Sequence, residues 1–197
     1  MRIVVAALAA LLMLVVLPPA WAAEAAPPAA DAPAAAPSRA EQLDTLFAKL
    51  KSAKDAAAAT QAENAIIAIW LRSGSATVDL LMSWGVEAIA NKDYPQALDI
   101  LDRVVTLQPD YAEGWNKRAT VYFLTDKYAQ SISDIEHVLV LEPRHFGALV
   151  GLGSIFRVLG DDKRAIDALK QALALDPHLD NARKALDKLE KDSGRDI

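Results

Sequence analysis

The motif that decides the fold occurs three times, as LQPD at residues 107–110, LEPR at 141–144 and LDPH at 175–178. Each copy places a proline two positions after a leucine, and successive prolines are 34 residues apart. A fixed period of this size indicates stacked supersecondary units, because one such unit cannot bury its apolar face alone. The sequence therefore predicts a repeat fold over residues 78–179.

Each unit reads as two helices joined by a tight turn. In the first unit, residues 78–90 carry apolar side chains at helical spacing, and residues 91–93 form the turn. Pro95 follows in the first turn of the second helix, where its missing N–H costs no hydrogen bond. Gly85 and Ala97 are small residues on facing helices, which lets the backbones approach closely. Small residues recur at the equivalent positions of the later units, namely Ala119, Ser131, Gly153 and Ala165.

This pattern resembles the tetratricopeptide repeat, which has a 34-residue period and fixed apolar, small and proline positions. Two positions depart from the family pattern, because Ala88 is small where an aromatic is usual and Arg118 replaces an apolar residue. The resemblance implies an all-α, right-handed α-solenoid of antiparallel helix pairs, with repeats at 78–111, 112–145 and 146–179. It rests on Leu81, Trp84, Gly85, Ala88, Ala97, Leu101, Val104 and Pro109, on Trp115, Ala119, Tyr122, Ser131, Ile135, Val138 and Pro143, and on Leu149, Leu152, Gly153, Phe156, Ala165, Leu169, Ala172 and Pro177.

Segments on both sides of the repeats are expected to cap the array. Residues 180–192 predict a helix with one apolar stripe and a charged remainder, as a solenoid needs at its last open face. Residues 38–77 predict a degenerate N-terminal helical hairpin, which starts with a Ser38–Glu41 capping box. Lys51 and Glu63 occupy positions that are small in the regular repeats.

The N-terminal segment predicts export. A positive start precedes the uncharged run at residues 3–17 and the small-x-small sequence AWA at 20–22, which together are typical of a signal peptide over residues 1–22. The alternative is an uncleaved membrane anchor, although a run of that length spans only about 22 Å of the roughly 30 Å hydrocarbon core. Residues 23–37 are mostly Ala and Pro, which predicts an extended linker or an ordinary disordered tail.

Composition excludes several functional classes. The chain has no cysteine, which rules out disulfides, thiolate metal sites and thiol nucleophiles. Its formal net charge of −5 disfavours a nucleic-acid binder, which needs a basic surface. We therefore expect no nucleic-acid partner.

No residue pattern indicates catalysis, a metal site or a cofactor. The three histidines, His137, His145 and His178, lack the spacing of a metal site, and we expect no role for them as ligands or catalysts. The glycines near residue 150 lack the strand and the Gly-Lys-Ser/Thr end of a phosphate loop. Asp126 and Asp161 lie in predicted turns, where each is expected to cap the next helix.

In the family, the first helix of each repeat lines a concave groove that holds a peptide or a helix of a partner. An exposed apolar patch at such a place would mark a binding site. The resemblance transfers the groove to Asp79, Met82, Val86, Ile89, Glu113, Asn116, Thr120, Phe123, Leu124, Gly147, Val150, Ser154, Arg157, Val158, Asn181 and Lys184.

One family subclass is set aside. Chaperone-binding members clamp a C-terminal carboxylate with Lys and Asn on the first repeat and with Lys and Arg on the third. Here Met82 and Val86 occupy the first pair of positions, and Gly147 and Gly151 occupy the second. We therefore do not expect an acidic C-terminal motif as the ligand.

These features predict a non-enzymatic adaptor of the cell envelope, held in the periplasm, that binds a protein or peptide partner in the groove. A membrane-tethered scaffold with an uncleaved N-terminal anchor is the alternative, and an accessory subunit of an envelope enzyme is a third. The membrane would be reached only through that anchor. The capping helix at 180–192 favours a monomer.

Overall fold

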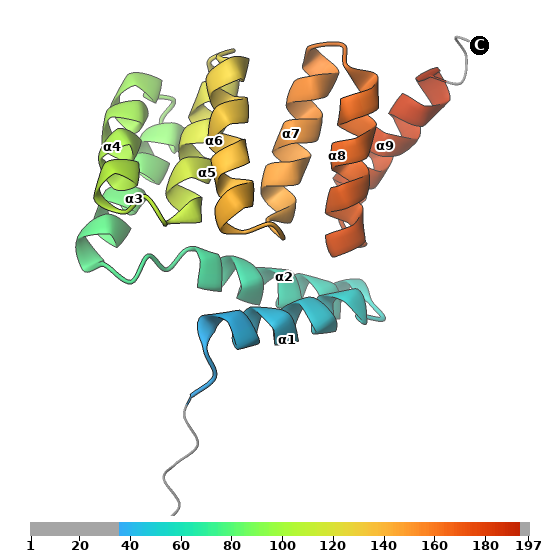
Figure 1. The fold of residues 1–197 in the computed structure, drawn as a ribbon, viewed down its shortest axis with the longest axis horizontal. Helices are drawn as coiled ribbons and strands as arrows, with labels where there is room; N and C mark the ends of the chain where they lie inside the picture. Colours follow the sequence, from blue (N-terminus) through green and yellow to red (C-terminus); the bar gives the residue numbers. More distant parts are fainter. Residues whose placement is uncertain (1–35, 194–197) are drawn as a thin grey trace, which may run out of the picture. The chain divides into compact units, whose positions relative to one another are not determined.

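The computed structural model describes residues 36–193, and within this range the regular structure is entirely helical (Figure 1). The predicted signal peptide and residues 23–35 of the linker lie outside the described residues. The helices are α1 (Arg39–Lys51), α2 (Ala56–Trp70), α3 (Ala76–Ala90), α4 (Tyr94–Leu107), α5 (Ala112–Leu124), α6 (Tyr128–Leu141), α7 (Phe146–Val158), α8 (Asp162–Leu175) and α9 (Asp180–Ser193).

Three antiparallel helix pairs, α3–α4, α5–α6 and α7–α8, form the array. Each second helix also packs on the first helix of the next pair, and α8 packs on α9 (Figure 1). The all-α solenoid that the sequence predicted is therefore confirmed. The Ser38–Glu41 capping box is present at the start of α1, and Pro95 lies in the first turn of α4.

The turn inside each pair contains one residue in the left-handed region. These residues are Lys92, Asp126 and Gly160, with φ values of 60°, 58° and 75°, and they follow the 34-residue period. Glycine adopts this conformation without a steric cost, whereas lysine and aspartate do so rarely. The repeat therefore dictates the backbone at this position even where the side chain is not suited to it.

Aspartates cap two of the three second helices. Asp93 and Asp161 accept hydrogen bonds from the backbone N–H three residues further on, as expected of a helix cap. The prediction for Asp126 was wrong. Helix α6 begins after Lys127, which provides no side-chain cap, and the Asp126 carboxylate instead accepts a 2.6 Å hydrogen bond from the Tyr128 hydroxyl.

The α1–α2 hairpin does not cap the first repeat. It packs against the ends of the later helices (Figure 1). Trp70, at the end of α2, lies 5.1 Å from the Phe146 ring, which begins α7. Leu175 and Leu179, on either side of the α8–α9 turn, pack against the same buried cluster. The expectation that residues 38–77 stack as a degenerate repeat is therefore corrected.

Polar contacts fix the hairpin in this position. The Tyr111 hydroxyl donates a 2.9 Å hydrogen bond to the Leu71 carbonyl, and Tyr111 itself is buried. Arg144 lies 2.6 Å from the Asp44 carboxylate, and its guanidinium covers the Phe47 ring. The hairpin thus contacts the loops at one end of the repeats and leaves the outer face of α3–α4 uncovered.

No helix among residues 36–193 is long and apolar enough to cross a membrane.

The first prediction concerns the close approach of α7 and α8 at Gly153. A Cβ at Gly153 would lie 2.9 Å from Cγ of Leu169, so Gly153→Ala forces α7 and α8 apart and should cost about 1–2 kcal/mol of stability. A Cβ at Gly151, two residues earlier on the same helix, would lie 3.5 Å from Cδ1 of Ile135, an ordinary contact. Gly151→Ala should therefore gain up to about 1 kcal/mol from helix propensity.

Urea denaturation followed by circular dichroism would measure both variants. Equal stability changes in the two alanine variants would contradict the close packing of α7 on α8.

Candidate functional site

Two neighbouring hollows lie along the first helices of the later repeats. The hollow between α5 and α7 has a volume of about 260 Å³, and the one between α7 and α9 about 220 Å³. Val150 and Ser154 on α7 line both, so the hollows form one groove, which we call the α5–α7–α9 groove. The first hollow is lined by Asn116, Ala119, Thr120, Phe123, Ser131, Ile135, Gly147, Ala148, Val150, Gly151, Ser154 and Ile155.

Eight of the sixteen residues transferred from the family line one or both hollows, and three of these, Gly147, Val150 and Ser154, come from α7. Asn116, Thr120 and Phe123 come from α5, while Arg157 and Asn181 line the second hollow. Four of the other transferred residues are exposed outside both hollows: Asp79, Val86, Leu124 and Lys184. Val158 is exposed as well, and Ile89 is half-buried against the α3–α4 core.

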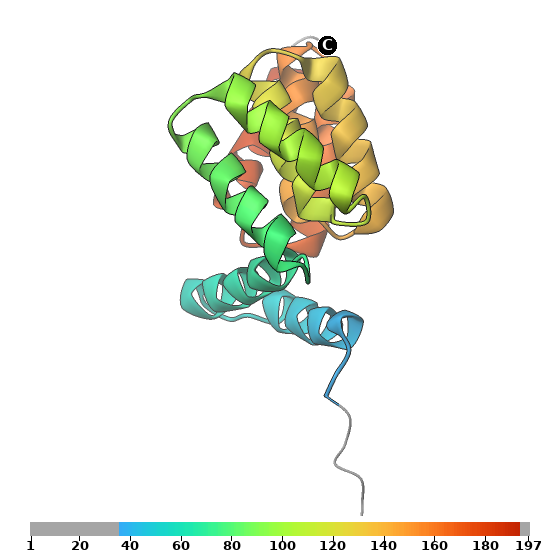
Figure 2. The same cartoon turned by 90° about the vertical axis from the view of Figure 1, so that its left-hand side faces the viewer.

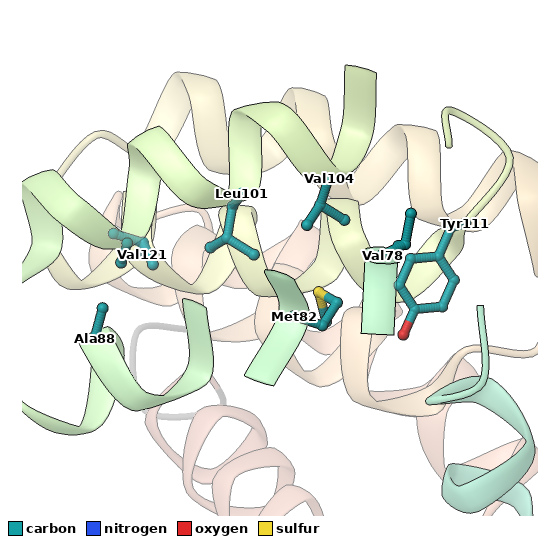
Figure 3. Close-up of a cluster of buried hydrophobic side chains, with 8 residues drawn as sticks. Val78, Met82, Ala88, Leu101, Val104, Tyr111 and Val121 are labelled. Carbon is teal, nitrogen blue, oxygen red and sulfur yellow. The ribbon is translucent and has the colours of Figure 1, made fainter. Parts of the chain in front are cut away.

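Met82 is not a groove residue. Its side chain is only 5% exposed and lies in the core beside Val78, Leu101 and Val104 (Figure 3). Met82 follows Val78 by one helical turn, so it shares the inward face of α3. The prediction that Met82 contacts a partner was therefore wrong, and the apolar patch expected on α3 is reduced.

Glu113 was also placed in the groove, but it is buried beneath it. One carboxylate oxygen, Oε1, lies 3.1 Å from Nε2 of His145, and the other, Oε2, accepts a 3.0 Å hydrogen bond from the Asn116 amide. Nδ1 of His145 accepts from the backbone N–H of Ala148, so the ring proton is assigned to Nε2 and donated to Glu113. The buried pair therefore holds the amide of Asn116, a residue that lines the groove.

Burial alone would raise the pKa of Glu113. The hydrogen bond from His145, the positive charge of Lys117 and the hydrogen bond from Asn116 outweigh burial, and they lower the pKa of Glu113 to about 2. Glu113 is consequently ionised across the neutral range, and its charge is balanced from inside the fold rather than by a ligand.

His145 also joins the groove to the hairpin. Its ring stacks on Trp70 at 4.3 Å between centroids, with 12° between the planes. His145 is the N-cap of α7 and is buried. The sequence placed it in an ordinary polar loop, and no local signal could have revealed a stack on a tryptophan 75 positions earlier.

Arg118 holds three helices together through an ion-pair network. The sequence contained a signal for this role, because Arg118 stands where the family pattern has an apolar residue. Its guanidinium makes two hydrogen bonds to the buried Asp134 carboxylate, at 2.8 and 2.7 Å, and one of 2.8 Å to Asp102 on the preceding repeat. The hydrogen bonds to Asp134 raise the pKa of Arg118 further above its already high value. An ion-pair network thus replaces an apolar contact between α4, α5 and α6.

Residues 36–193 contain no group of three or more His, Asp or Glu side chains placed to hold a metal ion.

The second prediction concerns the pH dependence of stability. The folded pKa of Glu113 lies near 2, below its ordinary value of 4.5, so its stabilisation is complete above pH 4.5 and is lost as the pH falls toward 2. Glu113→Gln should therefore flatten the loss of stability between these pH values, as measured by urea denaturation at a series of pH values.

Glu136→Gln serves as the control because it removes an exposed carboxylate from α6. The same acid sensitivity in Glu113→Gln and in the unchanged chain would contradict this assignment.

Comparisons with known proteins agree with this architecture. The family model described as tetratricopeptide repeat matches residues 82–136 and 125–180. A TPR repeat-containing protein of Rhizobium etli is 47% identical over 137 residues, which cover 70% of this chain and 67% of that protein.

Two solved structures share the fold. The first TPR domain of Spaghetti (RPAP3), bound to the HSP90 peptide SRMEEVD, has a TM-score of 0.57 and 21% identity over 59% of this chain and 93% of its own. The Yersinia enterocolitica type III secretion chaperone SycD, in complex with a peptide of the translocator YopD, has a TM-score of 0.58 and 13% identity over 60% of this chain and 96% of its own. With the family-model match and the Rhizobium relative, the chain belongs to the tetratricopeptide repeat family.

Proposed function

We propose that the chain is a non-enzymatic adaptor that binds an extended peptide or a helix of a partner protein in the α5–α7–α9 groove. The observation that carries this proposal is the hollow between α5 and α7, which has apolar walls and two glycines, Gly147 and Gly151, among its lining residues. Both structural neighbours above were solved with bound peptides, which supports the same use of the fold here.

The hollow suits one apolar side chain of the ligand. Phe123, Val150 and Ile135 provide apolar contacts, and the absence of side chains on Gly147 and Gly151 leaves room above α7. Burial of one such side chain contributes about 1.5–3 kcal/mol, so this hollow would supply an anchor and the rest of the groove would supply the remaining affinity.

Polar groups around the hollow would orient the peptide backbone. The Asn116 amide nitrogen is bonded to Glu113, which leaves the side-chain carbonyl oxygen of Asn116 to accept from a ligand N–H. At the α9 end, Arg157 and Lys184 are exposed and form no ion pair within the described residues. They favour an acidic side chain near that end of the ligand.

The ligand class differs from that of carboxylate-clamp domains. Two of the four clamp positions carry the glycines Gly147 and Gly151, one carries the buried Met82, and one carries the apolar Val86. None of these side chains can hold a terminal carboxylate, so an internal apolar segment is the proposed ligand.

The third prediction tests the groove. Thr120→Trp places a large side chain in the hollow. It should weaken the binding of a peptide selected from a random display library by tenfold or more, because the apolar side chain that anchors the peptide can no longer be buried there. Thr106→Trp on α4 is a matched control, because both threonines are exposed and bond the carbonyl four residues earlier.

Fluorescence anisotropy with the labelled peptide would measure both variants. Retained affinity in Thr120→Trp, or loss in both variants, would contradict binding in this groove.

We further propose that the adaptor works in the cell envelope, as the sequence of residues 1–22 suggests. The fourth prediction is that protein recovered from a bacterial periplasmic extract begins near Ala23, because signal peptidase cleaves after the small-x-small sequence at 20–22. N-terminal sequencing measures this start directly. A membrane-bound product that retains residues 1–22 would instead favour the tethered scaffold.

A further inference from the structure

The outer face of the first repeat is uncovered. Helices α3 and α4 lie in front in Figure 2, and no other helix of the described part of the chain lies over them. Leu80, Trp84 and Leu107 on this side are 50%, 49% and 60% exposed. We call the following stripe of residues the open face: Leu80, Trp84 and Glu87 on α3, Asn91 at the C-cap of α3, and Gln96, Ile100, Arg103 and Leu107 on α4.

Helical spacing places these residues together. On each helix they follow one another by three or four positions, which aligns them on one side. Five of them, Trp84, Glu87, Asn91, Gln96 and Ile100, line a shared hollow of about 280 Å³ between the two helices. The open face is therefore a continuous surface with an indentation beside the tryptophan.

The equivalent positions of the later repeats join each repeat to the preceding one. Thirty-four residues after Trp84 and Ile100 are Arg118 and Asp134, which pair with each other, while Arg118 also reaches Asp102 on α4. In the third repeat the position of Trp84 is taken by Leu152, which is partly buried in the core next to α6. In the first repeat the same position carries the large apolar ring of Trp84, which is 49% exposed among residues 36–193.

The chain's own hairpin does not supply the missing cover. Its large apolar side chains, including Ile66 and Trp70, are buried in the cluster at the ends of α7 and α8. Helix α9 covers the opposite end of the array, through contacts with α8. The sequence favoured a monomer because the helix at 180–192 covers the last repeat. That cover applies only to the C-terminal end of the array and not to α3–α4.

Charges on the open face match a second copy of the same face. Glu87 lies on α3 and Arg103 lies on α4, both exposed, and neither belongs to an ion pair within residues 36–193. A two-fold axis exchanges equivalent positions, so each contact between Glu87 and the Arg103 of a second copy occurs twice. One acidic and one basic group beside apolar residues thus make the face complementary to itself.

We propose that the open face is the interface of a two-fold symmetric homodimer, in which each Trp84 is buried against α3–α4 of the second copy. Tryptophan and arginine are the residue types that most often dominate such interfaces, which fits Trp84 and Arg103 as its centre. This dimer goes beyond the proposed adaptor function and leaves a groove on each copy.

The fifth prediction is the oligomeric state. Sedimentation equilibrium of the chain from Ala23 should give twice the monomer mass, and Trp84→Glu should give a monomer with unchanged helical content. Val140→Glu is the matched control, because Val140 is 78% exposed on α6, away from the open face, and this variant should remain dimeric.

A charge exchange tests the interface without the tryptophan. Glu87→Arg should weaken the dimer by about tenfold through like-charge repulsion, and the double variant Glu87→Arg with Arg103→Glu should restore it. A monomeric unchanged chain, or a dimer that survives Trp84→Glu, would overturn the proposal. Peptide binding in the groove should be the same in the Trp84→Glu monomer, so failure of the dimer and failure of the adaptor function are distinguishable.

Discussion

The structure depends on one constraint, namely that a single pair of these helices cannot bury its own apolar sides. Each pair closes internally because small residues such as Gly85, Gly153 and Ala165 let the two backbones approach. Its remaining apolar surface is covered only by the next pair. Everything else in the molecule follows from how the array ends, because the first and last pairs each have one side without a neighbouring repeat.

The two ends meet this constraint differently. At the C-terminal end, Ala182, Leu186 and Leu189 of α9 complete the core, and the rest of that helix is charged. At the N-terminal side, the hairpin buries Trp70 against His145 and Phe146 instead of against α3. His145 in turn bonds Glu113, which holds Asn116 at the groove. The hairpin therefore supports the floor of the binding site rather than extending the solenoid.

Much of the array could be predicted from the sequence, because a 34-residue period directly encodes helix pairs and their small contact positions. Whether Met82 belongs to the core or to the groove could not be predicted from the sequence. The answer depends on how α5 packs beside α3, and Val121 of α5 lies in the same core cluster as Met82. The position of the α1–α2 hairpin could not be predicted from the sequence either. Its apolar residues fit a stacked repeat as well as a crossing hairpin, and the decisive partners Phe146 and Leu175 are far away in sequence.

Helix α3 shows how one short helix can serve three separate contacts. Its inward residues Met82 and Gly85 form the core, Asp79 accepts hydrogen bonds from Ser73 in the loop before the helix, and Leu80 and Trp84 lie on the open face. These sets occupy different stripes of the helix because 3.6 residues per turn distributes neighbours around its axis. A change in one stripe can therefore alter one contact while leaving the others intact. The proposed groove on α5, α7 and α9 and the proposed interface on α3 and α4 share no lining residue, so partner binding and self-association can be varied independently.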